Sequence, residues 1–227
     1  MHLLRAMVTA NVSTTLRPAR SSWIGLGIAL FGLPAIRQVF RLINPNPGAD
    51  LVTVRELLTF ATAAGLLLLV TRWEQLPLTS VGLGSSVWWK SILWGMVIAI
   101  LSGGAAVILA KMTGYGHGPG SSAFERLPLW LITMIVFRAG IVEELFYRGY
   151  AIERFEAMGL GKFAAAAVPL LIFAAAHYTG GAANVLIALV IGGILSGFYL
   201  WRRDLVANMI AHTLVDFVAN VLPRLGS

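Results

Sequence analysis

Cysteine is absent from the 227-residue sequence, so disulfides, thiolate catalysis and cysteine metal ligands are excluded. Charge is scarce as well: Asp, Glu, Lys and Arg make up 12% of the residues. A globular domain has about 25%. The chain also lacks basic tracts interleaved with aromatic residues, so nothing in it indicates nucleic-acid binding. These absences leave a membrane protein as the class to test.

Apolar residues are abundant, at 58% of the chain, and the mean hydropathy is +0.80. Seven apolar segments approach the ~20 residues that span a bilayer as helix: 23–43, 55–72, 88–110, 128–148, 163–178, 183–201 and 204–222. They lack the alternation of barrel strands, and hydrocarbon leaves no backbone group unpaired. We therefore expect an all-α, polytopic membrane helix bundle of seven to eight transmembrane helices, the eighth being a re-entrant or interfacial piece.

The start of the chain, residues 1–22, is basic and contains no acid. It lacks the apolar core and cleavage site of a signal peptide. An organelle transit peptide is one alternative, but a short cytoplasmic tail is simpler. We expect residues 23–227 to form a single domain with a motif-bearing core at 128–222. The distribution of Lys and Arg between the loops predicts a multi-pass protein of the cell membrane with a cytoplasmic N-terminus.

Arg37 and Arg41 make the first expected span the least clear, because both lie in its last two turns and could snorkel to an interface. Among the ionisable residues of the later spans, five Glu, His and Asp residues stand out. An ionisable group in hydrocarbon is costly unless it is paired or hydrated, which makes it a candidate functional residue. The five are Glu143, Glu144, His177, His212 and Asp216.

Spacing groups these residues into pairs. Glu144 and Arg148 are four apart and can pair on one helical face, as can His212 and Asp216. Glu143 points to a different neighbour. Each pair has a structural alternative, as a buried ion pair or a helix–helix hydrogen bond.

Three single residues also have alternative interpretations. Glu143 could snorkel to the cytoplasmic surface, although the lack of a free basic partner at helical spacing argues against this reading. His177 could be an interfacial histidine. Arg138 lies mid-span with no acid at i±4, and could snorkel or help to hold a substrate carboxylate in a hydrated cavity.

Three short motifs carry a resemblance to a known family: "EELFYR" at 143–148, "FAAAH" at 173–177 and "HTLVD" at 212–216. In this order, on late transmembrane helices, they resemble the CAAX protease and bacteriocin-processing (CPBP, or Abi) family of intramembrane endopeptidases. That family includes the endopeptidase that removes the last three residues of prenylated CAAX proteins. "LTSVGLG" at 78–84 also resembles a short pre-helix element of the family.

The resemblance implies a role for each motif residue. Glu143 would be the base that activates water, and Glu144 with Arg148 would form a supporting ion pair. His177 would assist the water or bind a metal. A partly desolvated glutamate is suited to base chemistry near neutral pH.

In the third motif, His212 and Asp216 would stabilise the oxyanion or complete a metal site. Two histidines and a carboxylate suit zinc or a similar divalent ion, which makes His177 and His212 candidate ligands. The His-Glu-x-x-His pattern of common zinc proteases is absent, and the sequence leaves metal dependence open.

One geometric difficulty remains. If each expected span crosses fully, Glu143 and His177 lie near opposite membrane surfaces. Residues 177–184 could instead form a buried turn at mid-depth, and we expect one shared site below the inner surface. The resulting hypothesis is an endopeptidase that acts on a membrane-embedded or lipidated peptide. A proton-coupled transporter and a non-catalytic immunity or scaffold protein are the alternatives.

Overall fold

The computed structural model describes residues 20–84, 87–115 and 126–225, and within these ranges every regular element is a helix. This confirms the expected all-helical class. Most of the expected tail 1–22 lies outside the described residues. The longer α-helices outside the fourth expected span are α2 (Arg20–Ile43), α3 (Ala49–Leu68), α4 (Trp88–Thr113), α8 (Lys162–Ala175), α9 (Gly181–Arg202) and α10 (Leu205–Asn220).

Short helical pieces extend or connect these helices. A π-helical turn, η1 (Leu69–Trp73), continues α3, and a 3-10 turn, η2 (Leu78–Val81), precedes α4. Two further 3-10 turns are η5 (Tyr178–Gly180), between α8 and α9, and η6 (Leu222–Arg224), after α10.

Five helices among the described residues are long and apolar enough to cross a membrane: Arg20–Ile43, Ala49–Trp73, Trp88–Thr113, Tyr178–Arg202 and Leu205–Arg224. The expected number of seven to eight is therefore not confirmed. Helix α8 is apolar but has 14 residues. At 1.5 Å per residue it is roughly 21 Å long, short of the ~30 Å hydrocarbon core.

The fourth expected span, 128–148, is part of a longer composite helix. Its pieces follow one another without a break: α6 (Leu129–Arg138), η3 (Ala139–Glu143), η4 (Leu145–Ile152) and α7 (Glu153–Ala157). Both η segments are π-helical, a rare form that is frequent at functional sites. Because the helix continues to Ala157, Glu143 lies halfway along it rather than near its cytoplasmic end.

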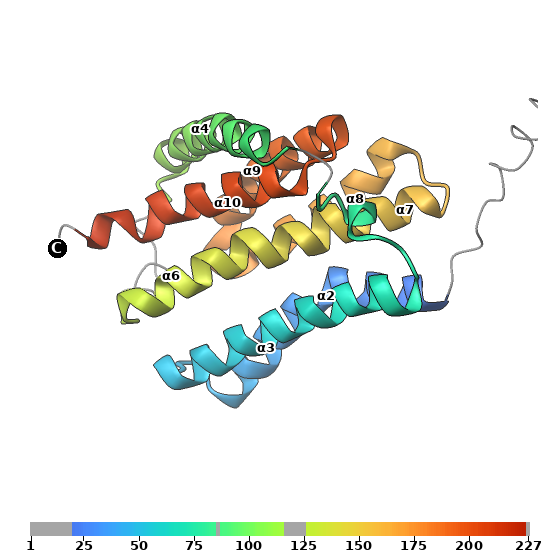
Figure 1. Cartoon of the computed structure of the whole chain (residues 1–227). Coiled ribbons are helices and arrows are strands. Elements are labelled where there is room, and N and C mark those ends of the chain that lie inside the picture. Colours follow the sequence, from blue (N-terminus) through green and yellow to red (C-terminus); the bar gives the residue numbers. More distant parts are fainter. Residues whose placement is uncertain (1–19, 85–86, 116–125, 226–227) are drawn as a thin grey trace, which may run out of the picture.

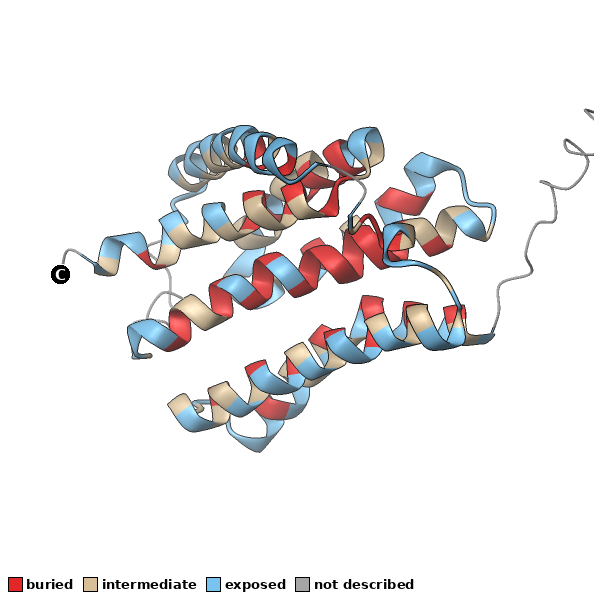
Figure 2. Cartoon of the chain, in the orientation of Figure 1, coloured by how far each residue is buried: buried red, intermediate tan, exposed pale blue. Residues whose placement is uncertain are grey.

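The composite helix runs through the centre of the bundle (Figure 1). Helices α2 and α3 pack on one side of it, while α10 packs on the other side and carries α4 and α9. Helix α8 packs against η4 and α9. Burial follows this arrangement, since every residue from 142 to 152 is buried while α2, α3 and α4 turn exposed faces outward (Figure 2). Apolar outward faces are what a lipid environment requires.

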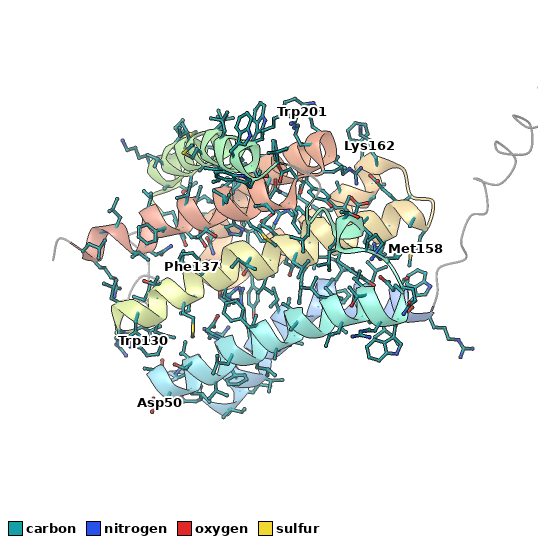
Figure 3. All side chains as sticks on the ribbon, in the orientation of Figure 1. Asp50, Trp130, Phe137, Met158, Lys162 and Trp201 are labelled. Atoms are coloured by element: carbon teal, nitrogen blue, oxygen red, sulfur yellow. The ribbon has the colours of Figure 1, made fainter. Side chains whose placement is uncertain are left out.

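Figure 3 shows the two ends of the bundle. Asp50 and Trp130 lie at one end, and Met158, Lys162 and Trp201 lie at the other. Tryptophans at opposite ends fit the aromatic belts of a membrane protein.

Glycine allows α10 to approach the composite helix closely. A Cβ added at Gly140 would lie 2.8 Å from the backbone nitrogen of Thr213 and 3.0 Å from the carbonyl oxygen of Met209. Backbone atoms cannot easily move away from such a contact. Gly140 therefore brings the face of α10 that carries His212 against the carboxylates of the composite helix.

A cluster of buried charged and polar side chains links α2, and Glu74 just after η1, to the composite helix. The Glu74 carboxylate accepts hydrogen bonds from Ser22 Oγ at 2.8 Å, Tyr150 Oη at 2.7 Å and Arg154 Nη2 at 2.7 Å. Burial alone would raise the pKa of Glu74, but these hydrogen bonds and the Arg154 charge lower that pKa below its ordinary value.

Candidate active site

Glu143 is buried in the centre of the bundle, with a side chain that is 3% exposed. Its Oε1 atom accepts hydrogen bonds from Arg37 Nη2 at 2.7 Å and from Arg138 Nη1 at 2.6 Å. Among the described residues no group donates to Oε2, and this atom is not one of the fully enclosed unpartnered atoms, Ser102 Oγ and Asn208 Oδ1. Oε2 is therefore accessible to water, and Glu143 does not snorkel.

The π-helical turn explains why Arg138 reaches Glu143. Residues five apart lie well past one turn of an α-helix, which has about 3.6 residues per turn, but they are neighbours in a π-helix. The Arg138 guanidinium also donates from Nε to Glu56 Oε2 on α3, at 2.6 Å. A search restricted to spacings of three and four residues misses both carboxylate partners of Arg138, which are Glu143 and Glu56. Arg37 likewise pairs with Glu143 rather than snorkelling, which the sequence also allowed.

Glu144 occupies a closed environment on a different face of the helix, with a fully buried side chain. Its Oε1 accepts from Arg148 Nη1 and from His212 Nδ1, each at 2.8 Å, and its Oε2 accepts from Asn208 Nδ2 at 3.1 Å. Arg148 also donates to the carbonyl oxygen of Gly192 at 3.1 Å. Both oxygens of Glu144 are thus engaged, which leaves no position for a reacting water.

His212 is oriented by this closed cluster. An ionised carboxylate only accepts hydrogen bonds, so His212 Nδ1 is the donor to Glu144. Its Nε2 lies 3.7 Å from Asp216 Oδ2, and the Asp216 side chain is 32% exposed. Asn208, which the sequence analysis does not single out, completes the group. Its signal is a polar stripe on one face of α10, with Asn208, His212 and Asp216 at intervals of four.

His177 is positioned by the end of α8. Its backbone nitrogen bonds to the carbonyl of Ala174, while its ring Nδ1 donates to the carbonyl of Phe173 at 2.7 Å. Since a carbonyl only accepts, Nδ1 carries the proton and Nε2 of the neutral ring has a free lone pair. The Phe173 ring contacts both histidines, with ring centroids 4.7 Å from His177 and 6.2 Å from His212.

The four candidate catalytic residues converge from three helical regions. Glu143, His177, His212 and Asp216 lie close enough to interact electrostatically with one another. This places His177 near the level of the middle of the composite helix. The turn after it is not buried by protein as expected, because Tyr178 is 59% exposed.

Tyr147 is a further residue of this group that sequence reasoning missed. It follows Glu143 by four residues, is buried, and its ring lies 5.2 Å from Phe173 between centroids. It interacts electrostatically with both Glu143 and Arg37. Its spacing from Glu143 within "EELFYR" was the available signal.

The side chains present do not fit a metal centre. Within the ranges described above, no group of three or more His, Asp or Glu side chains is arranged to hold a metal ion. The candidate ligand pair of His177 and His212 is therefore without a third protein ligand placed for zinc among these residues.

The helical fold and its apolar helices define a multi-pass membrane protein. Residues 125–218 match the family described as type II CAAX prenyl endopeptidase, Rce1-like. The match confirms the resemblance to CAAX proteases that the three motifs predict, and it includes all six motif residues of the candidate site. No curated protein and no solved structure matches the chain.

Proposed function

We propose that the protein is an intramembrane endopeptidase that hydrolyses a peptide bond of a membrane-associated substrate with water activated by Glu143. The observation that carries this proposal is the asymmetry of the Glu143 carboxylate. Oε1 is held by two arginines, while Oε2 is open to water, and Glu143 interacts electrostatically with His177. A fixed carboxylate with one free oxygen is suited to the work of a general base.

The reaction follows from these positions. Glu143 Oε2 takes a proton from water, whose oxygen forms a bond to the peptide carbonyl carbon, while His177 Nε2 accepts a hydrogen bond from the same water. As the tetrahedral intermediate collapses, the carbon–nitrogen bond breaks. The proton held by Glu143 passes to the departing amine, which leaves a carboxylic acid and an amine as products.

The negative charge on the carbonyl oxygen needs donors. His212 can donate from Nε2 in its imidazolium form, which is stabilised by carboxylates near both ring nitrogens. Tyr147 can donate from its hydroxyl. The Glu144–Arg148 pair does not touch the substrate in this scheme, because its role is to fix the position of His212.

The substrate class is a peptide held in or on the bilayer, including lipidated ends of the prenylated CAAX type that the matched family's description names. Cleavage would take place in a cell membrane, with the N-terminus of the protein on the cytoplasmic side. An apolar bundle with its reactive carboxylate halfway along the central helix suits a substrate that is itself anchored in lipid.

The test is cleavage of an S-farnesylated CAAX-type peptide by the purified chain in proteoliposomes, with products identified by mass spectrometry. We expect His177→Ala to lower kcat/KM by roughly 10²- to 10⁴-fold, the usual contribution of one acid–base residue. Glu156→Gln is the matched control, because Glu156 pairs with Arg203 away from the site, and it should retain activity.

A second arm adds a chelator. Because no three His, Asp or Glu side chains among the described residues are grouped to hold a metal ion, we expect cleavage to continue. Loss of activity that zinc restores would instead support metal assistance. Absence of any peptide product, with a biological effect that persists in His177→Ala, would favour a scaffold. Proton flux that follows a transported solute would favour a transporter.

A further inference from the structure

Two arginines bind the same oxygen of Glu143, and they are held very differently. Arg138 is buried and is fixed between two carboxylates, those of Glu56 and Glu143. The Arg37 side chain is 37% exposed, and Glu143 is its one ion-pair or hydrogen-bond partner among residues 20–84, 87–115 and 126–225. Arg138 is therefore an anchor, whereas the Arg37 head can leave Glu143 without breaking any other such contact.

The ion pairs around Glu143 are also unbalanced. A continuous chain of direct contacts joins Arg55 to Glu56, Glu56 to Arg138, Arg138 to Glu143 and Glu143 to Arg37. This chain contains three cations and two anions. One further anion would balance it, and the more exposed end of the chain is Arg37, whose side chain is 37% exposed against 23% for Arg55.

We propose that Arg37 is a specificity-determining residue that binds the terminal carboxylate of the peptide substrate, an inference that rests on the proposed endopeptidase function. Guanidinium and carboxylate groups form paired, charge-assisted hydrogen bonds, so the fit is chemically specific. Because Arg37 also touches Glu143, a carboxylate bound there would place the end of the peptide within a few residues of the reacting water.

Binding and activation are coupled by this geometry. When Arg37 turns to the substrate carboxylate, Glu143 Oε1 keeps Arg138 and loses one of its two cationic partners. With one positive charge fewer beside it, the ionised carboxylate of Glu143 is less stabilised, and its Oε2 becomes a stronger base. Arg37 would thus keep the resting base weak and release it when a peptide with a free carboxylate is in place.

This role depends on a part of the chain outside the family match. Arg37 lies on α2 and Glu56 on α3, whereas the match begins at residue 125. The inference is therefore particular to how these two N-terminal helices meet the composite helix.

The experiment measures binding rather than cleavage. The probe is a fluorescent, S-farnesylated hexapeptide with either a free C-terminal carboxylate or a carboxamide, added to the full chain in phosphatidylcholine nanodiscs. All proteins carry His177→Ala so that the peptide stays intact. With Arg37 present, we expect the carboxylate to bind about tenfold or more tightly than the carboxamide, as one charge-assisted pair would give.

Arg37→Gln should reduce this ratio to about one, mainly by weakening the carboxylate peptide. Arg41→Gln is the matched control, one turn further along the same helix and exposed, and it should keep the full ratio. Equal binding of the two peptides when Arg37 is present overturns the inference, as does an unchanged ratio in a cooperatively folded Arg37→Gln protein. If that variant does not fold, Arg37→Met takes its place.

The cleavage assay above fails independently of this one. A carboxylate preference that depends on Arg37, without any cleavage by the unsubstituted chain, would remove the proposed function and leave Arg37 as an anion-binding residue. Cleavage without any carboxylate preference would support the proposed function and rule out the role of Arg37 in binding the substrate carboxylate.

Discussion

Glu143 and Glu144 are neighbours in sequence, equally buried, and each paired with arginine, yet their surroundings differ in kind. Both oxygens of Glu144 accept hydrogen bonds from protein side chains, those of Arg148, His212 and Asn208. Glu143 has one oxygen bound by two arginines and one open to water. The comparison separates a carboxylate that holds helices together from one that is free to react.

The difference arises from the helix faces that carry the two residues. Adjacent residues of a helix point roughly 100° apart, so Glu144 faces α10 and α9 while Glu143 faces α2 and the end of α8. One side supplies Arg148, His212 and Asn208, which donate to both oxygens of Glu144. The other supplies an arginine whose side chain is 37% exposed. Four substitutions test this contrast, given from the largest expected effect to the smallest.

Glu143→Gln should abolish catalysis while leaving the fold intact. Removing the base should lower kcat/KM by about 10³-fold or more. Arg138 keeps Glu56 as its partner and Arg37 can turn to solvent, so no buried cation is stranded. Peptide cleavage and thermal unfolding of the same preparation check both halves. A large fall in melting temperature would show that Glu143 is structural in the way that Glu144 is.

Glu144→Gln should do the opposite and destabilise the fold first. Arg148 would be left fully buried without its carboxylate. Removing one partner of a buried ion pair costs about 3–5 kcal/mol. Denaturant unfolding in detergent measures the loss, and a Glu144→Gln, Arg148→Met double variant should recover part of it. Unchanged stability of the single variant would contradict the distinction drawn here.

Arg138→Gln should lower kcat by roughly 10- to 100-fold, since misplacement of a catalytic group by an ångström can cost about 10²-fold. The KM should change little, because Arg138 is buried behind Glu143. Arg138→Lys should restore part of the loss through the charge alone. An equal rise in KM would instead place Arg138 in the substrate site, with Arg37.

Glu74 should give the smallest effect, visible as a pH dependence of stability. Its pKa in the folded chain is below the ordinary value of 4.5, so its contribution is present above that pH and is lost as the pH falls through the lower, folded pKa. The melting temperature of the native chain should exceed that of Glu74→Gln at pH 7, and the gap should narrow below pH ~4.5. A gap in melting temperature that widens in acid would show that the pKa of Glu74 is raised, not lowered, by folding.

The helical class, the membrane setting and the motif residues were accessible from the sequence, because hydropathy and i,i+4 spacing are local signals. The partners of Glu143 were not. Arg138 reaches it through a π-helical turn that α-helical spacing does not describe, and Arg37 reaches it from a helix more than a hundred residues earlier in the chain. The short length of α8 was hidden for a similar reason. Its apolar composition continues to Ala176, while the backbone leaves the α-helix after Ala175.

That short helix has a consequence for the surrounding lipid. The turn Tyr178–Gly180 follows α8 near the level of His177, and Tyr178 is open to the outside of the bundle. The first N–H groups of a helix have no partner within it, and such groups are not tolerated in dry acyl chains, so we expect headgroups or water to penetrate beside this turn. Such a dimple in the bilayer would bring bulk solvent almost to the reacting carboxylate, and each turnover could draw its water from there rather than from either surface of an unperturbed membrane.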